Sequence, residues 1–372
     1  MSKPSRPPLT PLAASLPASV PFVGPEAQER RSGVLFRARL GANESPFGPS
    51  PRAIEAMHRA AAEVWKYGDP ENHDLREALA AHHGVQPSRI AIGEGIDGLL
   101  QLVARLFIRE GAPIITSAGA YPTFLFHVHG FGGRPVLVPY LEDHEDPDAL
   151  VAAAWEHRSS LVYLANPDNP MGTVHPASRI LGMLQDLPQE TVLALDEAYV
   201  EFGNPSQVLD EQFFDHRLVR LRTFSKAYGM AGARIGYAIA PSEIALAFDR
   251  VRNHFGVNRI AQAGALAAIN DQEHLSSTLA QVAAAKDEIA RIAQLNHLEP
   301  LPSATNFVAI DTGRDGHFSS NLVRALAERG VFVRMPTMPP QDRCIRVSAG
   351  PAKTLAALKE ALPEALAEIA QQ

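Results

Sequence analysis

The feature that most constrains the fold is an alternation between short apolar runs and helical patterns along the chain. Seven apolar runs follow one another from residue 89 onward, and helical patterns separate them. Most runs are almost continuously apolar, as expected for strands whose two faces are both covered. Such alternation predicts an α/β fold with a largely parallel sheet. The runs are residues 89–92, 113–117, 135–140, 161–166, 192–196, 218–224 and 235–240.

A second pattern begins near residue 275 and predicts a separate, smaller unit. Hydrophobic residues recur at helical spacing over 275–295, and again over 355–369 near the end of the chain. Three short strand signals lie between these helices, at residues 306–311, 331–334 and 344–348. This mixture is typical of an α+β domain that follows a larger α/β domain.

The first 33 residues differ from both units. They are rich in Pro and Ser and show neither a helical nor a strand period, which predicts an arm. Its prolines would break the hydrophobic region that a signal peptide needs. We therefore divide the 372 residues into an arm at 1–33, a large domain at 34–265 and a small domain at 266–372, which takes in part of the N-terminal segment.

Charge and cysteine content argue against several classes of function. Lys and Arg number 34 against 41 Asp and Glu, a net charge of −7, whereas general binders of nucleic acids or membrane surfaces need a basic face. No apolar run reaches the roughly 20 residues of a membrane-spanning helix. The single cysteine, Cys344, excludes an intrachain disulfide and fits a reducing compartment, so we expect a cytoplasmic protein. The fourteen histidines lack zinc-binding spacing, and we predict no metal site.

Polar residues follow three of the predicted strands. Asn166 and Asp196 end two of them, and Thr223, Ser225 and Lys226 follow a third. In open α/β sheets, ligands bind beyond the carboxyl ends of the strands. We therefore expect these residues to lie at a ligand site.

Lys226 is the strongest candidate for covalent chemistry. Lysine is rarely placed at the end of a buried strand without a task. An amine in a partly dry pocket can lose its proton and attack a carbonyl. Arg234, eight residues further on, could bind a phosphate. Taken alone, a lysine in an exposed loop is the more common explanation.

The segment 93–98 is a second candidate, because it matches G-x-G-x-x-G between a strand and a helix. It lacks the acidic residue after the next strand that a nicotinamide dinucleotide site requires. Glycines and free N–H groups at a helix N-terminus can still hold a phosphate, and a plain strand-to-helix turn is the alternative. Asp196 and Glu197 would point to opposite sides of a strand, so Asp196 acts without its neighbour as a base, a metal ligand or the partner of a protonated ring nitrogen.

Five segments together resemble the fold-type-I aminotransferases that use pyridoxal 5′-phosphate (PLP), and within them the histidinol-phosphate aminotransferases. The resemblance runs from about residue 39 to residue 350. It implies a large domain with a mostly parallel seven-stranded sheet, a smaller α+β domain, and a homodimer with shared active sites. The segments are residues 41–51, 166–172, 195–199, 225–234 and 344–348.

The resemblance also implies cofactor contacts at matching positions. Lys226 would form the Schiff base with PLP and then move a proton, while Asp196 would pair with the ring nitrogen. Tyr199 and Asn169 would hydrogen-bond the ring O3′, and Tyr121 would stack on the ring. The cofactor phosphate would be held by Gly95, Ile96, Asp97, Thr223, Ser225, Arg234 and, from the partner subunit, Tyr67.

Substrate contacts follow from the same resemblance. Arg346 would bind the substrate α-carboxylate through a bidentate pair, with Asn43 nearby. Arg334 matches the arginine that in this family helps to hold a distal phosphate. Phe22 stands where the family has an arm tyrosine that can face the substrate.

Three positions depart from the family pattern by lacking a hydroxyl group: Phe22, Phe124 and Ile96. Fewer hydroxyls would make the pocket less polar and better suited to an aromatic or aliphatic amino acid, because a hydrogen-bonding site discriminates less when its donors are lost.

The predicted function is a PLP-dependent aminotransferase. By a ping-pong mechanism it would move an amino group between an L-amino acid or histidinol phosphate and 2-oxoglutarate. The alternatives are an aminotransferase for aromatic or aliphatic amino acids, a PLP lyase or decarboxylase on the same scaffold, a nicotinamide-dependent oxidoreductase, and a non-catalytic homologue.

Overall fold

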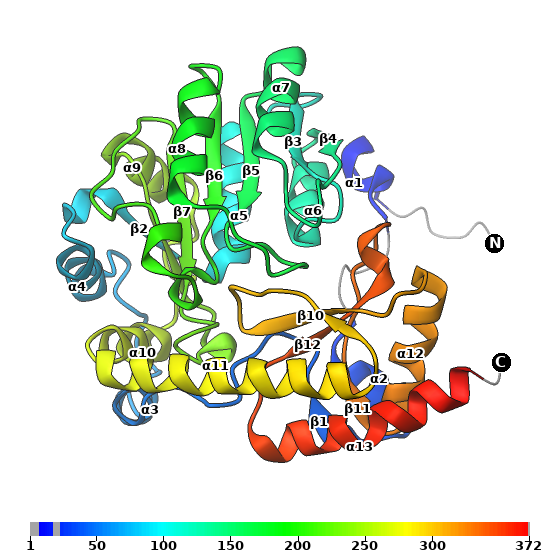
Figure 1. Cartoon of the computed structure of the whole chain (residues 1–372). Helices are drawn as coiled ribbons and strands as arrows, with labels where there is room; N and C mark the ends of the chain where they lie inside the picture. The colour runs from blue at the N-terminus through cyan, green and yellow to red at the C-terminus, as the bar shows by residue number, and fades with distance from the viewer. Residues whose placement is uncertain (1–6, 18–22, 371–372) are drawn as a thin grey trace, which may run out of the picture.

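In the computed structural model, which describes residues 7–17 and 23–370, a large twisted sheet lies above a smaller one (Figure 1). The large sheet has seven strands in the order β2-β8-β7-β6-β5-β3-β4, and only β8 runs antiparallel to its neighbours. Each predicted apolar run overlaps one strand, so the α/β prediction is confirmed. The strands are β2 (Ile90–Gly93), β3 (Pro113–Ser117), β4 (Arg134–Val138), β5 (Leu161–Ala165), β6 (Val192–Asp196), β7 (Leu218–Thr223) and β8 (Gly236–Ile239).

Helices cover both faces of this sheet (Figure 1). Every residue of β5, β6 and β7 is buried, which explains why these runs lack polar alternation. On one face lie α7 (Pro147–His157) and α8 (Ala177–Asp186). On the other lie α5 (Gly95–Phe107), α6 (Pro122–Gly130) and α9 (Ser242–Val251). Beside β2 and β8, a third cluster joins α3 (Pro51–Ala61), α4 (His73–His83) and α10 (Arg259–Ile269).

The smaller sheet is antiparallel and has the order β12-β10-β9. Next to it, β1 pairs in parallel with β11, so an N-terminal segment packs in the same hydrophobic cluster as the small sheet. The proposed boundary after residue 265 falls inside α10, and the division into domains stays a prediction. The elements are β1 (Ala38–Arg39), β9 (Glu299–Pro300), β10 (Phe307–Asp311), β11 (Val331–Phe332), β12 (Cys344–Ser348), α11 (Gln272–Leu295), α12 (Gly316–Glu328) and α13 (Ala352–Ile369).

The arm is more regular than the sequence predicted. It contains two short helices, α1 (Pro11–Ser15) and α2 (Pro25–Ser32), so the expectation of no helical structure is wrong. Each helix has a proline in its first turn, where the missing N–H is not needed and the fixed φ favours a helix. Gly33 then ends α2 in a left-handed conformation with φ 74°. Arg39, in β1, forms ion pairs with Glu26 and Glu29 of α2 and so joins this helix to β1 of the same chain.

Short 3₁₀ helices and capped helix starts complete the fold. Asp146 caps α7 by accepting hydrogen bonds from two backbone N–H groups, and Asp315 caps α12 in the same way with one. The 3₁₀ helices are η1 (Pro87–Arg89), η2 (Val200–Phe202), η3 (Pro205–Gln207), η4 (Ala231–Ala233) and η5 (Gln341–Arg343).

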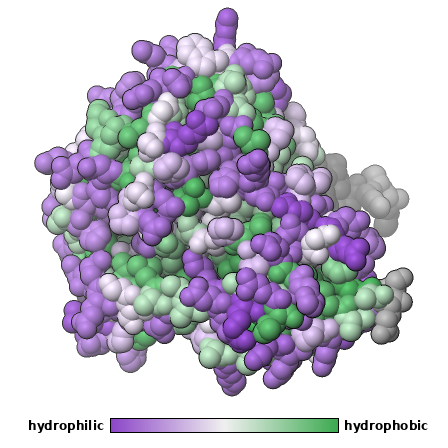
Figure 2. All heavy atoms as spheres, viewed as in Figure 1, coloured by the Kyte–Doolittle hydropathy of each residue, from purple (hydrophilic) through white to green (hydrophobic). Residues whose placement is uncertain are grey.

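On the face seen in Figure 2, hydrophobic residues gather in patches between hydrophilic ones. Among the helices of the described residues, none combines the length and the apolar character needed to cross a membrane.

Candidate active site

A cavity of about 440 Å³ lies where the carboxyl ends of β5, β6 and β7 face β12. These three strands are neighbours in the sheet, which brings together the polar residues that end them. The sequence-predicted residues that line the cavity are Asn43, Ile96, Asp97, Tyr121, Asn169, Asp196, Tyr199, Thr223, Ser225, Lys226, Arg234, Arg334 and Arg346.

Lys226 lies three residues beyond the end of β7 and is partly buried. Its Nζ donates a hydrogen bond of 2.9 Å to the backbone oxygen of Asn43 and lies 5.5 Å from the centre of the Tyr199 ring. Burial, with a smaller contribution from the positive charge of Arg346, lowers the pKa of the amine to about 8. A substantial fraction of the amine is therefore neutral near physiological pH, as a nucleophile or a base requires.

Asp196 ends β6 and is 5% exposed. The hydroxyl of Tyr163 donates to its Oδ2 at 2.8 Å, and the backbone N–H of Ala198 donates to Oδ1 at 2.9 Å. Burial raises the pKa of this carboxyl to about 6, although both hydrogen bonds oppose the rise. A buried carboxylate with no guanidinium or ammonium hydrogen-bonded to it gains from a cationic ligand atom in the cavity.

Asn43 connects three parts of the site. Its Nδ2 donates to the Tyr199 hydroxyl at 3.0 Å, and its Oδ1 accepts from the Ser348 hydroxyl at 3.1 Å. Its backbone oxygen is the acceptor for Lys226. Asn43 is 2% exposed, and its contacts link β12 to the segment that follows β6.

A cluster of donors suited to an anion lies at the N-terminus of α5. Gly95 begins this helix with φ 74°, and a Cβ there would lie 2.7 Å from Nη2 of Arg234, so only glycine fits. Arg234 Nη1 lies 3.4 Å from the Ser225 hydroxyl, and the Ser225 N–H donates to Thr223 Oγ1 at 3.1 Å. Helix N–H groups, two hydroxyls and a guanidinium therefore converge at one end of the cavity.

Tyr121 and Asp97 border the same end. The Tyr121 hydroxyl donates to Asp97 Oδ1 at 2.9 Å, and burial raises the pKa of this tyrosine. Ile96, between Gly95 and Asp97, lines the cavity with an apolar side chain. The cavity wall therefore has an apolar side chain at Ile96, where the family pattern has a hydroxyl.

Two arginines lie at the opposite end. The side chain of Arg346, on β12, donates to Oδ1 of Asn169. Burial lowers its pKa to about 10, and among the residues that the structure describes its Nε has no hydrogen-bond partner. The backbones of Arg334 and Arg346 form an antiparallel bridge, and Arg334 Nη2 donates to the backbone oxygen of Val23 at 2.9 Å. Two adjacent guanidinium groups create a second anion-binding end.

Three predicted residues that the structure describes, Gly95, Tyr67 and Phe124, are not among those that line the cavity. Tyr67 is 76% exposed, and its ring packs against Phe255 at 4.6 Å. Phe22 falls outside the described residues. Phe124 is fully buried and its ring stacks at 4.4 Å on that of Tyr163, which lines the cavity, but Phe124 itself is not a lining residue. The inference that Phe124 makes the pocket less polar is therefore wrong, because its side chain belongs to the core.

The sequence prediction missed Tyr163, the hydroxyl donor to Asp196. Tyr163 is the central residue of β5, and its signal was a lone tyrosine within an apolar strand run. A buried tyrosine hydroxyl needs a partner, so that position could have been paired with a carboxylate on the neighbouring strand.

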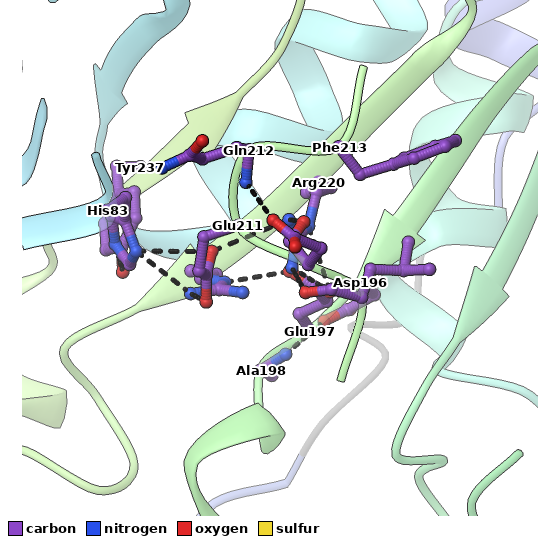
Figure 3. Close-up of polar contacts among 12 residues, drawn as sticks. His83, Asp196, Glu197, Ala198, Glu211, Gln212, Phe213, Arg220 and Tyr237 are labelled. Carbon is purple, nitrogen blue, oxygen red and sulfur yellow. Dashed lines mark hydrogen bonds and ion pairs between the residues drawn. The ribbon is translucent and has the colours of Figure 1, made fainter. Parts of the chain in front are cut away.

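Glu197 points away from the cavity, as the alternation of side chains along β6 predicted. Its carboxylate accepts from Arg220 Nε and Arg222 Nε at 2.9 and 2.8 Å. Both arginines also pair with Glu211, which in turn contacts His83 (Figure 3). This network joins Glu197, the residue after β6 and next to Asp196 in the chain, to β7.

The fold and the residues of this cavity are those expected of an aminotransferase, and comparison with known proteins gives the same class. Residues 38–364 match the family model described as aminotransferase class I and II, so the chain belongs to that class. Curated relatives narrow the assignment: the chain is a member of the histidinol-phosphate aminotransferase family. The family assignment disfavours the nicotinamide-dependent and non-catalytic alternatives.

Three similar proteins carry this name. The histidinol-phosphate aminotransferase of Anaeromyxobacter sp. is 38% identical over 91% of this chain and 94% of its own. That of Moorella thermoacetica is 34% identical, over 95% and 92%. The Sinorhizobium meliloti enzyme, whose crystal structure is in complex with pyridoxal-5′-phosphate, is 49% identical in sequence. Its structure superposes on this one with a TM-score of 0.95 over 98% of this chain and 99% of the S. meliloti chain.

Proposed function

We propose that this aminotransferase uses PLP to exchange an amino group between histidinol phosphate and 2-oxoglutarate. The observation that carries the proposal is the placement of Lys226 and Asp196 in one cavity that three arginines also line. Relatives at 34 to 49% identity bear the corresponding name, and the S. meliloti enzyme binds PLP.

The residues present fit the cofactor. Ser225, Thr223, Arg234 and the N-terminus of α5 would hold its phosphate, since they offer hydroxyl, guanidinium and backbone donors at one end of the cavity. Asp196 would hold the protonated ring nitrogen, because a buried carboxylate gains from a cationic partner. Tyr121 would cover one face of the ring. When bound, PLP supplies an electron sink for the negative charge that develops on the substrate Cα.

Lys226 would act as the base at the reacting carbon. Its Nζ, with a pKa lowered to about 8, can accept the proton from the substrate Cα and deliver it to C4′ of the cofactor. Tyr199 accepts a hydrogen bond from Asn43, which leaves its own hydroxyl proton to donate to the cofactor O3′, next to the Asn169 amide.

Arg346 and Arg334 would serve the two substrates in turn. Histidinol phosphate carries an amine and a phosphate but no carboxylate, whereas glutamate and 2-oxoglutarate carry two carboxylates. Arg346, with one unpaired Nε, would bind the α-carboxylate, and Arg334 would bind the distal anion of either substrate. Because Phe124 lies in the core, only Ile96 of the described departures reduces the polarity of the wall, which weakens the case for an aromatic or aliphatic donor.

The enzyme would work as a homodimer in which the partner's Tyr67 reaches the cofactor phosphate. In a single chain Tyr67 lies outside the cavity, on a surface where Trp65 is 77% and Val64 is 64% exposed. Apolar side chains this exposed, next to Phe255, are typical of a surface that another protein covers. A cytoplasmic location stays a prediction.

A half-reaction screen tests the substrate. The PLP form is mixed separately with histidinol phosphate, L-glutamate and L-phenylalanine, and loss of the cofactor's visible band is followed. We expect histidinol phosphate and glutamate to react at least tenfold faster than phenylalanine. Faster reaction with phenylalanine would refute the substrate assignment. Repeated turnover without any oxo acid would indicate a lyase, because an aminotransferase stops after one turnover when no oxo acid is present.

A further inference from the structure

A strained hairpin beside the cavity has no role in the chemistry described above. Residues 140–145, which we call the 140–145 hairpin, turn between β4 and α7. Leu141 and His144 exchange backbone hydrogen bonds of 2.9 Å, and the two residues between them, Glu142 and Asp143, have φ of 47° and 65°. Two consecutive positive φ values are typical of a tight I′ turn, in which Gly, Asn or Asp is usual and Glu is not. Such conformations persist only where the surroundings hold them, and they gather at functional sites.

The tip of the 140–145 hairpin is anchored to the segment that leads into β12. The carboxylate of Asp143 accepts two hydrogen bonds from Arg343, at 3.0 and 2.7 Å. Arg343 Nε also donates to Asp311 at 2.7 Å. Asp311 ends β10, so this second pair lies within the small sheet, whereas the Asp143 pair joins that sheet to the hairpin. A bidentate guanidinium–carboxylate pair fixes orientation as well as distance.

The other side of the 140–145 hairpin holds the loop after β5. The Tyr140 hydroxyl donates to Asp168 Oδ1 at 2.9 Å, and the Thr173 hydroxyl donates to the backbone oxygen of Asp143 at 3.1 Å. Glu145 is 1% exposed and accepts from the backbone N–H of Ala165 at 2.9 Å, at the end of β5. The position of this loop is therefore tied to the hairpin at several points.

Both anchors lead to the same contact in the cavity. Asn169 directly follows Asp168 in the loop, and Arg346 lies three residues after Arg343 in β12. The Arg346 side chain donates to Asn169 Oδ1. We propose that the 140–145 hairpin is a positioning element: through the Asp143–Arg343 pair it holds the Arg346 guanidinium against Asn169, and it thereby sets the affinity for the carboxylate substrate. This inference rests on the proposed function of Arg346.

The test compares the loss of two different carboxylate partners of one guanidinium. Asp143→Asn breaks the pair between the hairpin and the small sheet, while Asp311→Asn breaks a pair of equal length, 2.7 Å, within the small sheet. In the PLP-loaded enzyme, KM and kcat are measured for L-glutamate and for histidinol phosphate, which has no carboxylate. Because misplacing a positioned group by about 1 Å can cost up to ~100-fold, we expect Asp143→Asn to raise KM for glutamate by about tenfold.

Three further results are expected. KM for histidinol phosphate rises at least threefold less than KM for glutamate, Asp311→Asn changes neither KM by more than twofold, and the visible band of the bound cofactor is unchanged. Arg343→Lys, which keeps the charge but loses the bidentate geometry, reproduces Asp143→Asn and replaces it if that variant does not fold. An unchanged KM for glutamate, or an equal rise in Asp311→Asn, overturns the proposal. Wild-type enzyme that does not react with glutamate contradicts the proposed function instead.

Discussion

Replacing Tyr163 with Phe tests whether the electrostatics of Asp196 are set by a single hydroxyl. The change removes the 2.8 Å hydrogen bond to Asp196 Oδ2 and keeps the ring that stacks on Phe124. A hydrogen bond to a charged group is worth about 1.5–3 kcal/mol, and about 1.4 kcal/mol corresponds to one pKa unit. The hydroxyl stabilises the ionised carboxylate, so its loss raises the pKa of Asp196 from about 6 by roughly one to two units.

The consequence is a pH-dependent loss of cofactor affinity. At pH 7 the ionised fraction of Asp196 falls from about 0.9 to between about 0.5 and 0.1, which weakens PLP binding by roughly two- to ninefold. At pH 9 the Asp196 carboxylate is mostly ionised in both wild type and Tyr163→Phe, so the two proteins should bind PLP with nearly equal affinity. The assay is a titration of apoenzyme with PLP from pH 6 to pH 9, followed by absorbance.

A matched variant controls for the loss of a buried hydroxyl. Tyr140→Phe removes a hydrogen bond of 2.9 Å from a tyrosine to a buried aspartate, Asp168, that does not face the ring nitrogen. We expect it to leave the pH dependence of PLP affinity unchanged. The reasoning is refuted if Tyr163→Phe shows no shift, or if Tyr140→Phe shows the same one.

Four other substitutions probe the buried network, the hairpin and the phosphate end. Glu197→Gln leaves the two buried arginines of β7 short of a carboxylate and should lower the free energy of unfolding in urea by about 3–5 kcal/mol. The pKa of Glu211 is lowered to about 2, so Glu211→Gln should be less stable than wild type at pH 7, with a gap that closes as pH falls from 4.5 towards 2 in thermal melts. Glu142→Gly relieves a φ of 47° and should raise the free energy of unfolding by about 1 kcal/mol, which is measured as a higher Tm. Ser225→Ala should weaken PLP binding about tenfold through loss of one hydroxyl, as measured by absorbance titration.

The large sheet and much of the site could be predicted from the sequence because both depend on local patterns. Strands such as β5 and β6 are buried on both faces and leave continuous apolar runs. Parallel neighbours place their carboxyl ends together, so Asp196 and Lys226 could be assigned to one site before their contacts were known.

The partners of buried polar side chains could not be predicted from the sequence, because they depend on contacts between distant segments. The partners of Tyr163 and Glu197 lie 33 and 23 residues away, on neighbouring strands. Phe124 was assigned to the pocket because the family pattern has a tyrosine at that position, yet its side chain is buried in the core. The arm helices were missed because proline was taken only as a breaker, although in a first turn it favours a helix.

The most direct test of the central claim is the site at which the cofactor is covalently bound. PLP-loaded enzyme is reduced with borohydride, digested and mapped by mass spectrometry, with Lys286→Ala as a control because Lys286 is another partly buried lysine, bonded to a backbone oxygen at 2.7 Å. The account predicts one pyridoxyl group on Lys226 in wild type and in Lys286→Ala, and none in Lys226→Ala. A modified residue other than Lys226, or an unchanged visible band in Lys226→Ala, would contradict it.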